Sequence, residues 1–262
     1  MEIKEKEEIL QFAIYLARSA GKKTLSHFRK KGVVVERKGD DSPVTIADRE
    51  AEKWIREQIT GNYPDHGIIG EEFGEKQTGS RITWILDPID GTQSFIHGIP
   101  LYTTLIGVTI EGEPEIGVIY APAMDELCEA CIGLGARYNG QDCKVSDIDS
   151  IADATILSTD ITTIQKEGLG PSFQKLSDVC RIHRTWGDAY GHMMVATGRA
   201  EIMIDPILNI WDAAPLLPIL QESEGVFLDF KGFARIDSGH GFSSNNRLAA
   251  QVLPLMKKTM TK

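Results

Sequence analysis

Three acidic junctions in the chain carry residue types that could do metal chemistry. Glu71 ends the apolar run "HGIIGEE", Asp87 and Asp90 end "RITWILDPID", and Asp212 follows Trp211 where a helical pattern opens. In open α/β sheets, ligands bind beyond the carboxyl ends of the strands. We therefore expect these four carboxylates to share one site.

Converging carboxylates repel one another unless something compensates their charge. Two unit charges ~4 Å apart repel by roughly 4 kcal/mol at an effective dielectric constant of 20. Such a cluster persists only by protonation or by binding cations. Ligands that are all oxygen atoms favour Mg²⁺, Mn²⁺ or Ca²⁺ over zinc, which prefers His and Cys.

Each junction also has a simpler interpretation. The pair Glu71-Glu72 could be a solvated turn, and Asp212 could be a helix N-cap. Asp87-Pro88 could start a turn, while Asp90-Gly91 is a hairpin signal. The apolar setting shared by all three junctions favours the common site.

Gly91 and Thr92, which directly follow the second acidic junction, could bind an anion. Glycine lets the backbone approach a ligand closely, and a helix starting near Thr92 would point free N–H groups at it. Cation ligands beside an anion cradle suit a phosphate bridged to metal ions, where two metals can activate water and stabilise the leaving oxygen. Phosphate-monoester hydrolysis is so slow uncatalysed that enzymes supply up to ~10²¹-fold, which favours metal electrostatics over a lone base.

Competing motifs do not fit the sequence. The acids of "DPIDG" have the wrong spacing for an EF-hand, and Walker A, HExxH and GxSxG are absent. Cys128 and Cys131 have zinc-like spacing, but no second pair completes a site. Their strand-like surroundings place the two thiols on opposite sides, which favours free thiols.

Composition is that of an ordinary globular protein of one or two domains. The formal net charge of −10 argues against nucleic-acid binding, and no apolar run approaches the ~20 residues of a membrane span. The N-terminal segment lacks an apolar signal core. We therefore expect a cytoplasmic protein, or one in an organelle lumen, without nucleic-acid or membrane partners.

The elements that must position these residues follow from periodicity. Apolar spacing predicts long helices over 5–30 and 48–59, strands at the first two acidic junctions, and a three-stranded meander over 101–133. The second half predicts strands at 154–158, 201–204 and 226–229, and helices near 172–180, 189–197 and from 211 to before 225. Within the last helix Pro215 suits the first turn, whereas Pro218 should bend it or cost stability.

The pattern is that of a mixed α/β protein with helices layered on sheets. We expect an N-terminal α+β part, 1–146, that carries most of the acids, and a C-terminal α/β part, 147–262, that carries the Trp211-Asp212 motif.

The strings "GEE", "WILDPIDGTQSFIHG" and "WDAA", in this order and spacing, closely resemble the inositol monophosphatase-like superfamily. The likeness extends from "SPVTIADRE" to "GFSSNN". It implies a layered αβαβα sandwich, a homodimer, and a lithium-sensitive phosphatase that uses two or three Mg²⁺ ions, with Mn²⁺ as a substitute.

The resemblance also implies roles for individual residues. The metal ligands would be Glu71, Asp87, the Ile89 carbonyl, Asp90 and Asp212. Thr92, with Asp48 behind it and Glu71 nearby, would orient the nucleophilic water, and Gly91 and Thr92 would bind phosphate. Lys38 would lie on a loop near the third metal.

A second segment, "HRTWGDAYGHMMVATGRAEIMIDPILNIWDAAPLLPI", looks like the histidinol-phosphate phosphatase branch of the superfamily, as does "HGIPLYTTLIGV". Histidinol phosphate carries an ammonium and an imidazole, which extra carboxylates could meet. Asp188 could alternatively cap a helix, and Arg184 could pair across a dimer interface. The substrate-binding residues implied by this segment are Arg184, Gly187, Asp188, Ala189, Asp205 and Asp212.

The sequence thus predicts a Mg²⁺-dependent phosphomonoesterase that hydrolyses L-histidinol phosphate in histidine biosynthesis. The alternative enzyme is an inositol-1-monophosphatase or a broader sugar- or polyol-phosphate phosphatase. The lack of a basic cluster disfavours a nucleotide 3′-phosphatase. A metal-binding regulatory protein would need neither Thr92 nor Asp48, so their presence favours an enzyme.

Overall fold

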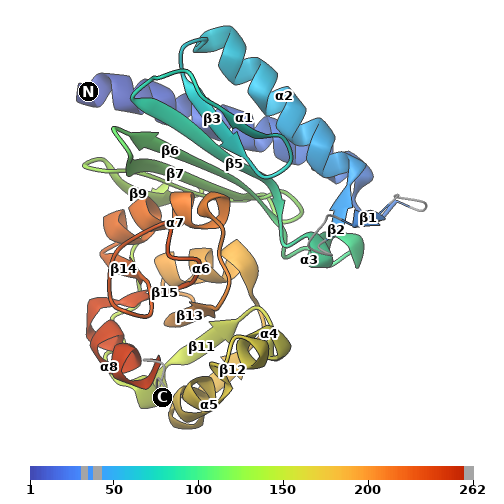
Figure 1. Ribbon diagram of the computed structural model, residues 1–262. Coiled ribbons are helices and arrows are strands. Elements are labelled where there is room, and N and C mark those ends of the chain that lie inside the picture. The colour runs from blue at the N-terminus through green and yellow to red at the C-terminus, as the bar shows by residue number, and fades with distance from the viewer. Residues whose placement is uncertain (31–34, 38–42, 257–262) are drawn as a thin grey trace.

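The protein is a stack of five alternating layers of helices and sheets (Figure 1). The structure is a computed structural model that describes residues 1–30, 35–37 and 43–256. Helices α1 and α2 cover the outer face of an eight-stranded sheet, and α6 and α7 lie between it and a five-stranded sheet. Helices α4, α5 and α8 lie on the far side of the second sheet. This is the layered αβαβα sandwich that the family resemblance implies.

The first sheet is almost entirely antiparallel, with the parallel pair β3 and β5 near one edge. In spatial order its strands are β10 (Gln141–Asp142), β9 (Gly135–Tyr138), β8 (Glu126–Cys131), β7 (Glu113–Ala121), β6 (Thr103–Ile110), β5 (Ile82–Asp90), β3 (Gly67–Gly70) and β4 (Gly74–Lys76). A separate ribbon pairs β1 (Val35–Arg37) with β2 (Pro43–Thr45).

The second sheet is mixed, because β11 is parallel to both of its neighbours and β15 is antiparallel to its own. In spatial order its strands are β12 (Ile182–Arg184), β11 (Thr155–Ser158), β13 (Ile202–Asp205), β15 (Gly241–Asn245) and β14 (Gly225–Leu228). The division of the chain at 146/147 stays a prediction.

Most helices form where the apolar periodicity predicts them, whereas α4 and α8 were not predicted. They are α1 (Ile3–His27), α2 (Ile46–Asn62), α3 (Thr92–Ile96), α4 (Ile161–Lys166), α5 (Gly170–Val179), α6 (Asp188–Ala196), α7 (Ile210–Glu222) and α8 (Asn246–Met256), with a short 3₁₀ turn at Ile151–Asp153. Because α7 starts at Ile210, Pro215 falls in its second turn, and the helix continues through Pro218 as well. None of the helices described is long and apolar enough to cross a membrane.

Three apolar cores lie between successive layers. The first joins α1 and α2 to the eight-stranded sheet, the second surrounds α6 and α7, and the third lies under α5 and α8. Cys131 belongs to the first core and Cys128 to the second. The two thiols therefore face opposite sides of β8, as the strand pattern predicts, and cannot share one metal ion.

Candidate active site

The end of β5 presents two carboxylates to one side of the sheet through a break in its register. Asp87 and Asp90 are three residues apart, so a regular strand would point them to opposite faces. The pairing with β6 is irregular between these two positions, and the Thr104 hydroxyl holds the intervening Pro88 carbonyl at 2.9 Å. Such bulges re-aim side chains near active sites. The strand continues through Pro88, where the sequence suggested a turn.

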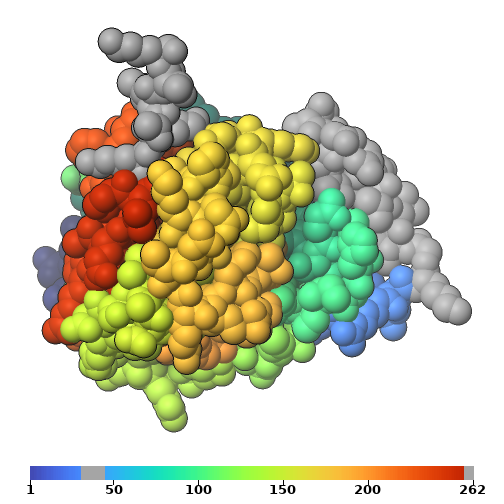
Figure 2. Space-filling model, turned by 90° about the horizontal axis from the view of Figure 1, so that it is seen from below, coloured from blue at the N-terminus to red at the C-terminus, as the bar shows by residue number. Residues whose placement is uncertain are grey.

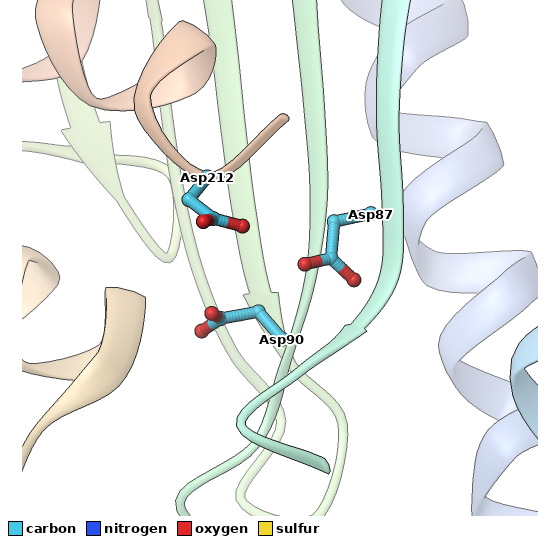
Figure 3. Close-up of side chains that lie close together, drawn as sticks. All are labelled: Asp87, Asp90 and Asp212. Atoms are coloured by element: carbon cyan, nitrogen blue, oxygen red, sulfur yellow. The ribbon is translucent and has the colours of Figure 1, made fainter. Parts of the chain in front are cut away.

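Helix α7 adds a third carboxylate from more than a hundred residues further along the chain. Asp212 lies in its first turn, where one oxygen accepts the Asn209 N–H at 2.7 Å. Oxygens of Asp87, Asp90 and Asp212 all lie within 4.8 Å of one another. Figure 3 shows the three side chains pointing toward a common centre, two from β5 and one from α7. The convergence expected for these three acids is thus present.

Burial and mutual repulsion raise the pKa values of this cluster. Loss of hydration raises the pKa of Asp87 well above its ordinary value, and the charges of Glu71, Asp90 and Asp212 raise it further. Burial likewise raises the pKa of Asp90 to about 7, although N–H and hydroxyl donors from Ala189 and Thr103 lower it. The donor set is all oxygen and densely anionic, so it fits a hard divalent cation.

The residues after β5 suit close approach of an anion. Gly91 has a left-handed backbone with φ of 75°, and α3 begins at the next residue, Thr92. A Cβ on Gly91 would lie 2.9 Å from the Asp188 Oδ2 atom. The Thr92 hydroxyl donates to the Ile89 carbonyl at 3.1 Å. Glycine is required here both by the backbone conformation and by the space.

These groups open into one cavity of about 530 Å³ between the two sheets. Its first-sheet wall consists of Glu71, Asp87, Ile89, Asp90, Gly91, Thr92, Gln93, Ser94 and Leu101, and its opposite wall of Thr159, Asp160, Thr185, Gly187, Asp188, Asn209, Trp211 and Asp212. Seen from below, Figure 2 shows the teal segment around α3 beside the yellow and orange segments of the C-terminal half of the chain. The cavity thus has an acidic wall on each side.

Glu71 is positioned by a buried carboxylate behind its turn. It follows β3, and its N–H donates to the Leu86 carbonyl of β5 at 3.2 Å. Glu52, fully buried on α2, accepts the N–H groups of Glu72 at 2.7 Å and Phe73 at 3.2 Å. Arg56 pairs with Glu52 at 2.7 Å. The turn that carries Glu71 is therefore fixed by ionic hydrogen bonds.

Asp48 lies at the start of α2 and is almost fully buried. Its carboxylate accepts both the N–H and the hydroxyl of Thr45, at 2.8 and 2.6 Å. Burial raises its pKa to about 7, with smaller contributions from Glu72 and Glu71. Asp48 is not among the residues that line the cavity, so its action on Thr92 stays a prediction.

The residues predicted to bind substrate are distributed unevenly. Gly187 and Asp188 line the cavity, and the Ala189 N–H donates to Asp90 at 2.8 Å. Asp205 lies behind the wall, and Arg184 is exposed on β12, where it donates to the His183 carbonyl. Their predicted substrate contacts remain predictions. Lys38 lies outside the described residues.

Several cavity residues were not singled out from the sequence. Asp160 follows β11 as Glu71 follows β3, so the strand-end rule that identified Glu71 applies to it equally. Trp211 was noted only as the neighbour of Asp212. Thr159, Thr185 and Asn209 carry no signal of their own, because isolated small polar residues are common in loops.

Comparison with known proteins gives a consistent result. Residues 5–259 match the inositol monophosphatase family. A histidinol-phosphatase of Chlorobaculum parvum is 42% identical over 245 residues, which cover 93% of this chain and 95% of that protein.

Two solved structures have the same fold. The extragenic suppressor protein suhB of Bartonella henselae has a TM-score of 0.90 at 28% identity, covering 97% of this chain and 100% of its own. An inositol monophosphatase of Zymomonas mobilis has a TM-score of 0.85 at 29% identity, covering 95% and 98%. This chain therefore belongs to the inositol monophosphatase family, and it is a phosphoric monoester hydrolase.

Proposed function

We propose that the protein hydrolyses L-histidinol phosphate to L-histidinol and phosphate in a Mg²⁺-dependent reaction that serves histidine biosynthesis. The observation that carries the proposal is a single cavity that holds the metal-type cluster of Asp87, Asp90 and Asp212 together with two further acids, Asp160 and Asp188. The 42% identity to a protein named histidinol-phosphatase supports the choice of substrate.

At the metal end, Asp87, Asp90 and Asp212 would hold the first Mg²⁺, and Glu71 and the Ile89 carbonyl would complete the ligand set. Mn²⁺ has the same preference for oxygen ligands. Bound Mg²⁺ supplies positive charge that polarises the phosphate and activates a water molecule for attack. Asp87 and Asp212 each accept a local backbone N–H, from Ile89 at 3.0 Å and Asn209 at 2.7 Å, which orients them toward the cation.

The phosphate would sit against the turn at Gly91 and Thr92. With no side chain on Gly91, backbone N–H groups can approach the phosphate oxygens. The Thr92 hydroxyl would orient the attacking water, and Asp48 would hold the start of α2 behind it. In-line displacement requires the water on the side of phosphorus away from the leaving oxygen, and Thr92 would hold it there.

The leaving group would extend toward the second-sheet wall. Histidinol phosphate presents an ammonium and an imidazole, and Asp160 and Asp188 offer negative charge to both. Trp211 lines the same wall and is partly exposed, so its ring can stack on an imidazole or contact a cation. An uncharged polyol would gain less from these groups.

A phosphate-release assay over a small substrate panel tests this proposal. We expect L-histidinol phosphate to be hydrolysed with a kcat/KM at least about tenfold above that of inositol 1-phosphate in Mg²⁺, since one charged contact is worth at least that factor. EDTA should abolish release from both. A preference for inositol 1-phosphate would refute the substrate assignment, and activity in EDTA would refute the metal assignment.

Inositol-1-monophosphatase, or a broader sugar- or polyol-phosphate phosphatase, is the second candidate function. The specific observation in its favour is the structural match to an inositol monophosphatase at a TM-score of 0.85. Homodimer formation and inhibition by Li⁺ belong to either proposal. Light scattering and a lithium titration of the same assay test them.

A further inference from the structure

Asp205 ends β13 close to the cavity, yet its carboxylate is turned away from it. The residue is 5% exposed and is not among those that line the cavity. Both oxygens have protein partners: the Thr159 hydroxyl donates to Oδ1 at 2.8 Å, and His192 Nε2 lies 3.2 Å from Oδ2. This geometry suits a residue that supports the wall rather than one that contacts substrate.

Thr159 connects Asp205 to the first turn of α6 through two hydrogen bonds. Its hydroxyl donates to Asp205 and accepts the backbone N–H of Asp188 at 2.9 Å. Asp188 has a left-handed backbone with φ of 55°, which a non-glycine residue adopts only where its surroundings enforce it. A Cβ on Gly187 would overlap the Thr159 backbone, so the two segments are in direct contact.

The next backbone N–H connects the same turn to the metal cluster. Ala189 donates to Asp90 Oδ2 at 2.8 Å. Two consecutive N–H groups of α6 therefore donate to different acceptors: that of Asp188 to the Thr159 hydroxyl and that of Ala189 to the predicted metal ligand Asp90. A shift of this turn would therefore displace Asp188 and weaken the hydrogen bond that orients Asp90.

His192 holds the far side of Asp205. It lies one turn further along α6 and is fully buried, with Nδ1 2.6 Å from the Ser243 hydroxyl of β15. Its ring also packs edge-on against Phe227 at 5.8 Å. The hydrogen-bonded series Ser243–His192–Asp205–Thr159–Asp188 thus joins two strands of the second sheet, β15 and β13, to the cavity.

We propose that Asp205 and Thr159 are positioning residues that fix the first turn of α6, and through it both the leaving-group carboxylate of Asp188 and the metal ligand Asp90. The inference rests on the proposed function for the roles of Asp188 and Asp90. It replaces a direct contact between Asp205 and substrate with an indirect action through Thr159.

Three threonine variants test the proposal. Thr159→Val removes the hydroxyl at nearly constant volume, and Thr159→Ser retains it. Thr197→Val removes a hydroxyl at the other end of α6, which donates to backbone carbonyls and accepts from Arg199 Nε, away from the cavity. We expect Thr159→Val to lower kcat/KM by about ten- to a hundredfold, because hydrogen bonds to charged groups are the strong ones. Thr159→Ser should stay within about threefold of wild type, and Thr197→Val should leave kcat/KM unchanged.

Two readouts do not depend on turnover. Calorimetric Mn²⁺ binding without substrate should weaken in Thr159→Val by at least about threefold, since the turn whose Ala189 N–H orients Asp90 is held less firmly. Amide hydrogen exchange of the segment 187–190 should accelerate in the same variant and not in Thr197→Val. Unchanged Mn²⁺ affinity together with unchanged exchange would overturn the proposal.

A double-mutant cycle separates indirect from direct action of Asp205. If Asp205 acts through Thr159, kcat/KM of the double variant Thr159→Val with Asp205→Asn should be at most about threefold below that of the less active single variant. Losses that multiply would overturn the proposal. The cycle is measured with histidinol phosphate and with p-nitrophenyl phosphate, so a wrong substrate assignment affects only the first, and Mn²⁺ binding remains informative if neither is hydrolysed.

Discussion

Replacing Gly117 by alanine should displace the helix that carries Asp212. Gly117 on β7 pairs with Gly107 on β6, and both lie directly under α7. A Cβ on Gly117 would overlap the Pro215 carbonyl oxygen and lie 2.9 Å from its carbonyl carbon. These are rigid backbone atoms, so α7 must move by at least the difference from an ordinary contact, which begins at 3.4 Å.

Two effects follow from that displacement. Overpacking of a tight core typically costs about 1–3 kcal/mol, and each kcal/mol lowers Tm by roughly 2–4 °C in a protein of this size. We therefore expect Tm to fall by about 5 °C. Because Asp212 lies one turn before Pro215, the ligand cluster opens, and a misplacement approaching 1 Å can cost up to about a hundredfold in rate.

Differential scanning calorimetry and phosphate release at several Mg²⁺ concentrations measure both effects. The matched control is Gly61→Ala near the end of α2, where a Cβ would meet nothing within 4 Å. Removing a helical glycine there should raise stability by up to about 1 kcal/mol without changing activity. A Gly117→Ala protein with wild-type Tm and wild-type Mg²⁺ dependence would show that the close contact between Gly117 and α7 does not position Asp212.

Three further predictions concern buried acids. Asp87→Asn should abolish phosphate release, yet raise stability in EDTA by about 1–3 kcal/mol, because a neutral amide replaces a buried carboxyl group whose ionisation burial and the neighbouring acids oppose. It should also cancel the stabilisation by Mg²⁺, and lower stability in EDTA would contradict this. Glu52→Gln presents an NH₂ donor to backbone N–H donors, so it should lower the free energy of unfolding in urea by about 2–4 kcal/mol. It should also weaken Mn²⁺ binding, because it loosens the turn that carries Glu71; unaltered Mn²⁺ binding would refute this connection between Glu52 and Glu71. Burial raises the pKa of Glu129 from 4.5 to about 7, although the nearby charges of Arg137 and Arg18 lower it. Between these pH values the folded protein holds a proton on Glu129 that the unfolded chain releases, so stability should fall as pH rises from 4.5 to 7. In Glu129→Gln, the loss of unfolding free energy between pH 4.5 and 7 should be smaller by about 1–2 kcal/mol, allowing for solvent screening. A pH profile of Tm identical to that of wild type would disprove the assignment.

Periodicity predicts the elements whose burial is one-sided. Helices α1 and α2, the β6–β8 meander and the strand–helix alternation around α6 and α7 form where the apolar spacing places them, with ends within a few residues. Strand β15 was missed because it reads "GFSSN", and its Ser243, Ser244 and Asn245 are buried through hydrogen bonds rather than apolar contact. Asn139-Gly140 is a standard hairpin signal and forms the turn between β9 and β10, which were not among the predicted strands.

The acidic cluster could be predicted because its members lie at strand and helix ends. What could not be predicted is the supporting wall. Thr159 and His192 gain their roles only from tertiary contacts with Asp205, and Ala189 contributes a backbone N–H, which no residue type specifies. Side-chain chemistry is visible in a sequence, whereas the partners of backbone groups depend on the completed fold.

The sequence posed a turn start at Asp87 and an N-cap at Asp212 as alternatives to metal binding. The N-cap of α7 is Asn209 and not Asp212, which is the third residue of the helix, but the local hydrogen bonds of both acids are compatible with a shared site. Asp87 accepts the Ile89 N–H as in an Asx turn, and Asp212 accepts the Asn209 N–H as part of a capping box. Each local bond engages one oxygen and fixes the side-chain torsions, so the second oxygen faces the cluster without a further loss of rotamer freedom. A capping acid beside other buried acids is therefore a preorganised ligand, and its local structural role is part of how it binds.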